Sequence, residues 1–166
     1  LTPESNQTSR MSISFSKSLL PHFLQAVPDG ISSAGDLVNQ TSAPSFATTT
    51  YDGKPLSSET FAGTPHLLYF WFTGCPPCVR TSPLLAELDK TYAAKGFRIV
   101  GLNADRVLEI PTTDEDRAAY ARKNGWEFTL AHMTSATQEA YGAVSVFPTM
   151  FLVDRKGTIV KQLVNF

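Results

Sequence analysis

The fold is decided by residues 66–78, which read HLLYFWFTGCPPC. The stretch opens with an unbroken apolar and aromatic run that has the length of a strand buried on both faces, as the strands of a parallel sheet are. Gly74 and the prolines that follow mark a turn, and residues 78–94 have the apolar spacing of a helix. The stretch therefore predicts a strand, a turn and a helix, with two cysteines, Cys75 and Cys78, at the turn.

Further elements follow on both sides of this stretch. A hairpin is predicted around Asp52-Gly53, because a β-branched and aromatic run at 46–50 precedes this turn pair. Apolar runs predict strands at 97–103, 128–131, 145–153 and 158–164. Further helices are predicted to begin at residue 56 and to span residues 114–123 and 134–140. This order predicts an α/β fold in which a mixed central β-sheet is flanked by helices on both faces.

The N-terminal part of the chain differs in composition from the rest. Residues 1–42 are dense in Ser, Thr, Asn and Gln and contain one apolar stretch, residues 13–27. We interpret them as a polar extension or tether with a short helix at 18–26, followed by a globular domain at 43–166. The chain begins at Leu1 instead of a methionine, which predicts a processed or trimmed product whose signal or anchor is not part of this chain.

Composition excludes several classes of protein. The chain has 166 residues, with 14 Lys and Arg against 15 Asp and Glu, so its formal net charge is −1. That balance offers no electrostatic footprint for nucleic acid, and no apolar run approaches the roughly 20 residues of a membrane-spanning helix. Two cysteines are too few for a Cys-only zinc site, and the histidines, His22, His66 and His132, stand at no partner spacing. We therefore expect one domain with no metal, no cofactor and no nucleic-acid partner.

The spacing of Cys75 and Cys78 predicts a redox-active dithiol. Cys75 would lie at the N-terminus of a helix, where free backbone N–H groups and the helix dipole stabilise a thiolate and lower the pKa of the thiol. Cys75 is therefore the expected nucleophile. Cys78 lies one turn further along and is expected to be more buried, so it would resolve the mixed disulfide that Cys75 forms with a substrate.

The spacer between the cysteines consists of two prolines. Neither Pro76 nor Pro77 has a backbone N–H, so of these three residues only Cys78 can donate to the Cys75 thiolate. We expect a less stabilised thiolate than in a spacer that contains histidine, and therefore a more reducing couple. The two prolines are thus the residues that we expect to tune the redox potential.

Residues 70–78 resemble the active-site segment of the thioredoxin superfamily. Pro83 matches the proline that kinks the active-site helix of that superfamily, and VFPT at 146–149 resembles the loop that carries its cis-proline. Within the superfamily the chain is similar to the TlpA/ResA-like branch of extracytoplasmic thiol-disulfide oxidoreductases. That likeness rests on APSF at 43–46, on DGK at 52–54 and on an extra helical segment between the strand at 97–103 and Tyr141. The resemblance covers residues 43–166.

The resemblance implies a thioredoxin-like fold with an N-terminal β-hairpin and an extra helical insert. It also implies a cis peptide bond before Pro148, which would place the backbone of Phe147 beside the disulfide, where it can pair with an extended substrate peptide. Further substrate contacts are expected from Val146, Gly74 and Trp71. For Trp71, a place in the core is an equally good interpretation. The implied partners are protein disulfides and a membrane-bound thiol reductase as electron donor, in a periplasmic or membrane-tethered, extracytoplasmic location.

The chain departs from the superfamily at several positions. Tyr69 stands where thioredoxins carry a buried aspartate that manages the proton of the resolving cysteine, and Gly101 stands where they carry a lysine. Thr81 stands where many TlpA-like reductases have a glutamate, so we expect a proton route that uses no nearby carboxylate. Gly74 replaces the usual tryptophan and Val146 a frequent glycine, so the fine specificity of a relative does not carry over.

Two other functions are compatible with the same sequence. A peroxiredoxin-like thiol peroxidase has a threonine three residues before its peroxidatic cysteine, a place that Phe72 takes here. A non-catalytic interaction module would use the same scaffold to present residues 1–42. Turnover of a hydroperoxide identifies the first alternative, and failure to reduce insulin identifies the second.

Overall fold

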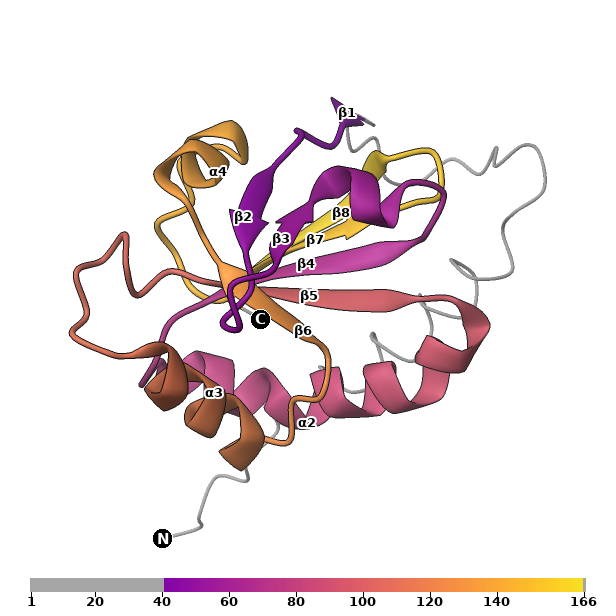
Figure 1. The fold of residues 1–166 in the computed structure, drawn as a ribbon. Coiled ribbons are helices and arrows are strands. Elements are labelled where there is room, and N and C mark those ends of the chain that lie inside the picture. The colour runs from indigo at the N-terminus through magenta and orange to yellow at the C-terminus, as the bar shows by residue number, and fades with distance from the viewer. Residues whose placement is uncertain (1–40, 166) are drawn as a thin grey trace, which may run out of the picture. The chain divides into compact units, whose positions relative to one another are not determined.

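The computed structural model describes residues 41–165. A six-stranded mixed sheet lies at the centre of this part of the chain (Figure 1), with its strands in the order β1-β8-β7-β4-β5-β6. The strands are β1 (Thr41–Ser42), β4 (His66–Trp71), β5 (Arg98–Asn103), β6 (Thr129–His132), β7 (Thr149–Val153) and β8 (Thr158–Val164). β4, β5 and β6 are parallel, whereas β7 runs antiparallel to β4, and β8 runs antiparallel to β7. The mixed α/β sheet predicted from the sequence is confirmed.

β4 is the strand that leads into the cysteines. All of its residues are buried, because β5 and β7 pair with its two edges and both faces of the sheet are covered. Since β4, β5 and β6 are parallel, their carboxyl ends meet at one edge of the sheet, where α/β proteins bind and react. The residues that follow β4 and β5, 72–78 and 104–106, are therefore brought together there.

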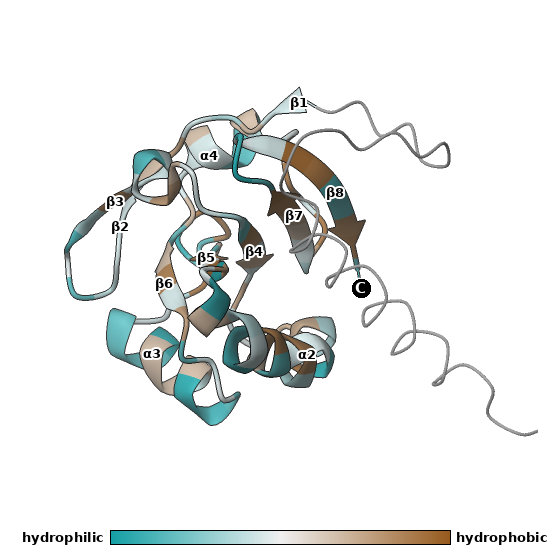
Figure 2. Cartoon of the chain, turned by 90° about the vertical axis from the view of Figure 1, so that its right-hand side faces the viewer, coloured by the Kyte–Doolittle hydropathy of each residue, from teal (hydrophilic) through white to brown (hydrophobic). Residues whose placement is uncertain are grey.

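Helices cover the two faces of the sheet. α2 (Pro76–Tyr92) and α3 (Asp114–Lys123) lie on one face, whereas the β2–β3 hairpin (Ala47–Thr49 and Pro55–Ser57), η1 (Ser58–Phe61) and α4 (Ser135–Ala140) lie on the other (Figures 1 and 2). The short η2 (Ala93–Lys95) follows α2 and ends at Gly96, whose φ of 86° is the left-handed conformation of a helix stop. Within residues 41–165, no helix is both long enough and apolar enough to cross a membrane.

Aromatic side chains fill the space between the sheet and α3. Trp71 stacks on Tyr120 of α3 with 5.7 Å between ring centroids, and it meets Trp126 edge to face at 4.7 Å. Gly101 of β5 lies against this cluster, where a Cβ atom would come within 2.8 Å of Leu130 Cδ2 and 3.1 Å of Trp71 Nε1. The packing of Trp71 and Leu130 therefore leaves no room for a lysine at this position.

Several element boundaries differ from the sequence predictions. The strand predicted at 145–153 begins at Thr149, because Pro148 has no N–H to donate to a neighbouring strand. The helix predicted to begin at Cys78 begins at Pro76, because proline has the backbone angle of a first helical turn and needs no N–H partner there. These two differences arise from prolines. The helix predicted to begin at 56 is instead the short 3-10 helix η1, because Leu56 pairs within the β2–β3 hairpin and Ser57 is the N-cap.

The sheet also begins earlier than the predicted domain boundary. Residues 41–42 form β1, which pairs antiparallel with β8 through Thr41 and Ile159, whereas the sequence predicts a domain that starts at residue 43. The described residues all belong to the second of two units into which the chain divides, residues 38–166. The predicted helix at 18–26 lies outside the described residues.

Candidate active site

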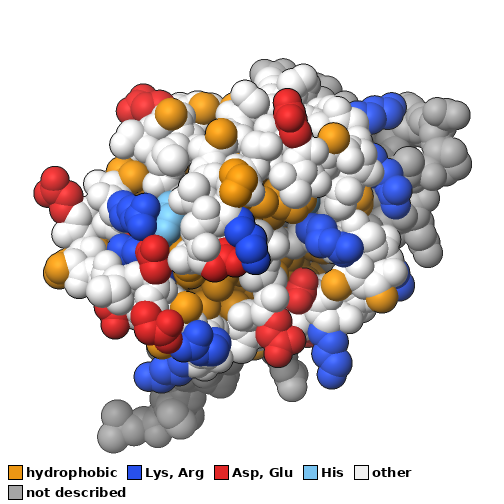
Figure 3. Space-filling model, in the orientation of Figure 1, with side chains coloured by type: hydrophobic (Ala, Val, Ile, Leu, Met, Phe, Trp, Pro, Cys, Tyr) orange, Lys and Arg blue, Asp and Glu red, His pale blue; other side chains and the backbone are white. Residues whose placement is uncertain are grey.

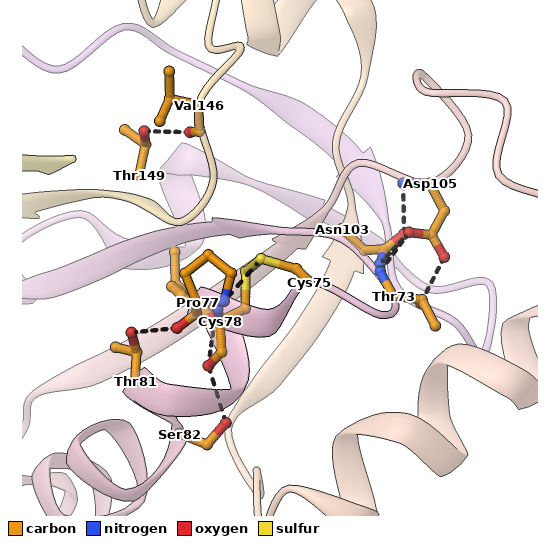
Figure 4. Close-up of a disulfide and its surroundings, with 11 residues drawn as sticks. Thr73, Cys75, Pro77, Cys78, Thr81, Ser82, Asn103, Asp105, Val146 and Thr149 are labelled. Atoms are coloured by element: carbon orange, nitrogen blue, oxygen red, sulfur yellow. Dashed lines mark hydrogen bonds between the residues drawn. A yellow bond between two sulfur atoms is a disulfide. The ribbon is translucent and has the colours of Figure 1, made fainter. Parts of the chain in front are cut away.

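The two cysteines lie at the turn between β4 and α2 and form a disulfide (Figure 4). The sulfur atoms are 2.13 Å apart, and the Cα atoms of Cys75 and Cys78 are 5.2 Å apart. Both side chains are buried. Contrary to the expectation, Cys78 is therefore not more buried than Cys75 in this oxidised form, in which a disulfide bond joins the two sulfurs.

Cys75 is the N-cap residue of α2. The backbone N–H of Cys78 donates a hydrogen bond to Cys75 Sγ over 3.3 Å. The first two helical positions are Pro76 and Pro77, which have no N–H, so the spacer and Cys78 together provide one backbone donor for this sulfur. A negative charge on Cys75 Sγ would also lie at the positive end of the dipole of α2.

Hydroxyl groups surround the backbone on the inner side of the disulfide. Tyr69 Oη and Ser82 Oγ donate to the Cys78 carbonyl over 3.4 and 3.2 Å, and Thr81 Oγ1 donates to the Pro77 carbonyl over 3.0 Å. Burial raises the pKa of Tyr69 well above the ordinary value of a phenol, so this hydroxyl stays protonated. Tyr69 thus places a neutral hydroxyl where thioredoxins are expected to carry a carboxylate.

The loop before β7 is joined to the residues that precede the cysteines. Its Phe147–Pro148 peptide bond is cis, as the resemblance implies. The ring of Phe147 packs edge to face on Phe72 with 5.5 Å between centroids. Thr149 Oγ1 donates to the Val146 carbonyl over 2.6 Å, which holds the loop at the start of β7 (Figure 4).

The predicted substrate-binding residues differ in exposure. Val146 is 47% exposed and Gly74 is exposed as well, whereas Phe147 is only 9% exposed. Trp71 has no exposed surface. It lies in the aromatic cluster against Tyr120, so of the two roles that the sequence allows for Trp71 its burial favours the core role.

Sequence patterns do not predict the carboxylate that lies buried beside the active-site turn. Asp105 follows β5 and has no exposed surface. Its oxygens accept hydrogen bonds from Thr73 N (2.8 Å), Thr73 Oγ1 (2.6 Å) and Asn103 Nδ2 (3.1 Å) (Figure 4). Thr112 Oγ1 donates a further one over 2.5 Å. Burial raises the pKa of Asp105, but these hydrogen bonds together lower it further, so the pKa lies below its ordinary value and the group is ionised at neutral pH. Its one sequence signal is a polar pair at the end of a buried strand, with Asn103 as the last residue of β5 and Asp105 two positions later.

Arg117 of α3 balances the charge of Asp105. The side chain of Arg117 is 4% exposed, and its Nε lies 3.4 Å from Asp105 Oδ2. Arg117 also donates to the carboxylate of Asp114 and, over 2.7 Å, to the carbonyl of Thr112. A buried ion pair therefore connects the inserted helix to the residues beside the disulfide.

On one face of the protein, the surface charges show no bias towards one sign. On the face drawn in Figure 3, Lys and Arg side chains are interspersed with Asp and Glu side chains, in keeping with the formal net charge of −1. A partner that binds this face is therefore not selected by a large field of one sign.

Comparisons with known sequences agree with this geometry. A family model described as Redoxin matches residues 38–165. Thiol-disulfide oxidoreductase ResA of Bacillus thuringiensis strain Al Hakam is 32% identical over 125 residues, which cover 74% of this chain and 68% of that protein. Thioredoxin-like protein YneN of Bacillus subtilis strain 168 is 29% identical over 117 residues, which cover 70% of this chain and 66% of that protein.

Solved structures show the same arrangement of elements. A putative thiol:disulfide interchange protein DsbE from Chlorobium tepidum is 30% identical, with a TM-score of 0.65 over 78% of this chain and 86% of that chain. The thioredoxin domain of a thiol-disulfide oxidoreductase from Bacteroides vulgatus is 26% identical, with a TM-score of 0.67 over 78% of this chain and 90% of that chain.

The fold, the disulfide at the start of α2 and these relatives define a class of enzyme. The protein is a thiol-disulfide oxidoreductase with a thioredoxin-like fold. The chain belongs to the Redoxin family, and within the thioredoxin superfamily it is TlpA/ResA-like.

Proposed function

We propose that this enzyme reduces disulfides of other proteins, with Cys75 as the attacking thiolate and Cys78 as the resolving cysteine. The Cys75 thiolate attacks one sulfur of a substrate disulfide, the substrate S–S bond breaks, and the released sulfur takes up a proton. Cys78 then loses its proton and attacks Cys75 Sγ, which releases the second substrate thiol. Two electrons pass to the substrate, and the enzyme ends as the Cys75–Cys78 disulfide.

The observation that supports these roles is the position of the two sulfurs relative to α2. Cys75 is the N-cap residue and accepts the Cys78 N–H over 3.3 Å, so a thiolate at Cys75 is stabilised by both a donor and the helix dipole. Cys78 lies within the first turn of α2, and its sulfur is already bonded to Cys75 Sγ in this structure. Attack by Cys78 on a mixed disulfide therefore needs little movement.

We place the substrate across the loop at Pro148. Val146 offers an exposed apolar side chain on this loop, and the exposed Gly74 leaves the other side of the disulfide without a side chain. The backbone of Phe147 would pair with an extended peptide there. The interspersed surface charges are compatible with recognition by backbone pairing and apolar contact instead of by a charged patch.

The oxidised enzyme must be reduced again before another turnover. We propose a membrane-bound thiol reductase as the electron donor, in an extracytoplasmic location that is periplasmic or membrane-tethered. The resemblance to TlpA/ResA-like enzymes supports both assignments. The sequence has 2 cysteines, both in the motif, which leaves no further thiol to mispair in an oxidising compartment.

Reduction of insulin in the presence of dithiothreitol tests the proposal. We expect the wild type to accelerate insulin precipitation, and Cys75→Ser to fall to the rate of dithiothreitol alone, because serine cannot form the mixed disulfide. Equal rates for both proteins would indicate a non-catalytic interaction module. Turnover of a hydroperoxide without insulin reduction would instead identify a thiol peroxidase.

A further inference from the structure

Thr73 is held at two atoms just before the cysteines. Its N–H donates to Asp105 Oδ1 over 2.8 Å and its Oγ1 donates to Asp105 Oδ2 over 2.6 Å. The turn that contains Thr73 is closed by the N–H of Cys75, which donates to the Phe72 carbonyl over 3.3 Å. Gly74, the next residue, has a φ of 85°, so the chain reverses between the held residue and Cys75. The position of Thr73 therefore determines where Cys75 enters α2.

Asp105 is itself anchored within the framework of the protein. Asn103 Nδ2 and Thr112 Oγ1 donate to its two oxygens, over 3.1 and 2.5 Å. The buried guanidinium of Arg117, 3.4 Å away at Nε, balances its charge. Asn103 of β5 and Arg117 of α3 are enough to hold this carboxylate as a rigid point to which the turn is attached, and Thr112 adds one further donor.

α3 also packs on the last residue of β4, Trp71, one helical turn beyond Arg117. Tyr120 stacks on Trp71, and the two ring planes are 10° from parallel. Its hydroxyl group is buried. Burial raises the pKa of Tyr120, so the hydroxyl stays protonated. Arg117 and Tyr120 stand three residues apart on the helix, so one face of α3 contacts both Asp105 and Trp71.

We propose that Asp105 is a positioning residue of the redox site, which holds Thr73 so that Cys75 Sγ stays at the N-terminus of α2, and that Arg117 makes the inserted helix α3 part of this support. The inference rests on the proposed function, because it takes Cys75 as the attacking sulfur. Asp105 acts through Thr73 and does not itself exchange electrons or protons with a substrate.

The proline spacer makes this support more important than it would be in other spacers. Pro76 and Pro77 provide no N–H, and the one donor from the motif, Cys78 N–H, is 3.3 Å from Cys75 Sγ. If Cys75 Sγ moves relative to this one donor, most of its hydrogen bonding is lost, because hydrogen bonds weaken steeply with poor geometry. A small displacement of Cys75 therefore changes the reactivity of its thiolate.

The rate of Cys75 alkylation by iodoacetamide, measured against pH in a Cys78→Ser background, tests the inference. We expect Thr73→Val to lower the rate at pH 6 by about three- to tenfold and to move the midpoint of the pH profile upwards, because less of the thiol is ionised. Thr73→Ser retains the hydroxyl donor and should restore most of the rate.

Thr112→Val provides a matched control. Thr112 Oγ1 donates to the same oxygen of Asp105 as Thr73 Oγ1 does, but it lies outside the turn that carries Cys75. We expect its alkylation rate to stay within about twofold of the parent, since one lost hydrogen bond leaves Thr73 in place.

Equal profiles for Thr73→Val and Thr112→Val would overturn the inference, because the network would then act only through global stability. An unchanged profile for Thr73→Val would overturn it as well. The assay needs no disulfide substrate, so its outcome is separate from that of insulin reduction. Failure of the wild type to reduce insulin would count against the proposed function and leave the alkylation comparison interpretable.

Discussion

Cys78→Ser is expected to convert the enzyme into a trap for its substrates. Cys75 can still attack a substrate disulfide, but without a second thiol the mixed disulfide is released only by an external reductant. We expect turnover with a reduced protein donor to fall by at least about 10³-fold, as it does when one member of a catalytic group that acts as a unit is removed. The mixed disulfide should accumulate as a covalent adduct.

The adduct is measured by mass under non-reducing conditions. Cys78→Ser is mixed with an oxidised protein substrate, and the remaining thiols are blocked. The sample should contain a species whose mass is the sum of the two proteins, and dithiothreitol should cleave it. The matched variant Cys75→Ser should give no such species. An adduct that forms with Cys75→Ser and not with Cys78→Ser would reverse the two assignments.

Asp105→Ala is expected to cause a large loss of stability. The change removes the acceptor of Thr73, Asn103 and Thr112 and leaves the buried Arg117 without one of its two carboxylate partners. Breaking a buried, hydrogen-bonded ion pair of this kind costs about 3–5 kcal/mol of the free energy of unfolding. Urea unfolding followed by circular dichroism measures this loss.

Asp116→Ala is the matched control for this comparison. Asp116 lies on the exposed side of α3, the helix that carries Arg117, and it accepts the N–H of Thr113 over 2.8 Å. The same chemical change there should have a much smaller effect on the urea midpoint. A loss in Asp105→Ala no larger than in Asp116→Ala would contradict the assignment of Asp105 to a buried, fully bonded site.

Acid should reduce the difference in stability to urea between the wild type and Asp105→Ala. The hydrogen bonds around Asp105 outweigh burial and lower its pKa in the folded protein, so its ionised form stabilises the fold at pH values above about 4, the ordinary pKa of an aspartate. This contribution is lost as the pH falls through the folded pKa. The two urea midpoints should therefore converge below about pH 4.

Local sequence was sufficient for the main elements around the site. The apolar run of β4, the proline-rich turn and the alternation of strands and helices are all encoded within short segments. The amphipathic helix at 114–123 was predicted with the bounds that α3 has in the structure. These features depend on period and turn chemistry, which neighbouring residues determine.

Contacts between distant segments were beyond the reach of the same reasoning. Thr73 and Asp105 are 32 positions apart, and nothing near Arg117 in the sequence shows that α3 will bury its guanidinium beside them. The neighbours of Trp71 were unpredictable for the same reason. An apolar run predicts that a residue is buried, but it does not indicate which side chains surround it. Its place in the core depends on Tyr120 and Trp126, which arrive from the inserted segment.

The redox potential of the Cys75–Cys78 couple tests the central claim, a reductant of protein disulfides, most directly. Equilibration with a glutathione or dithiothreitol buffer, followed by thiol trapping, gives the midpoint. Because one backbone N–H from the motif reaches Cys75 Sγ, we predict a potential well below the about −180 mV of protein disulfide isomerase and towards the about −270 mV of thioredoxin. A value near about −120 mV, that of a strong protein oxidant, would contradict the account.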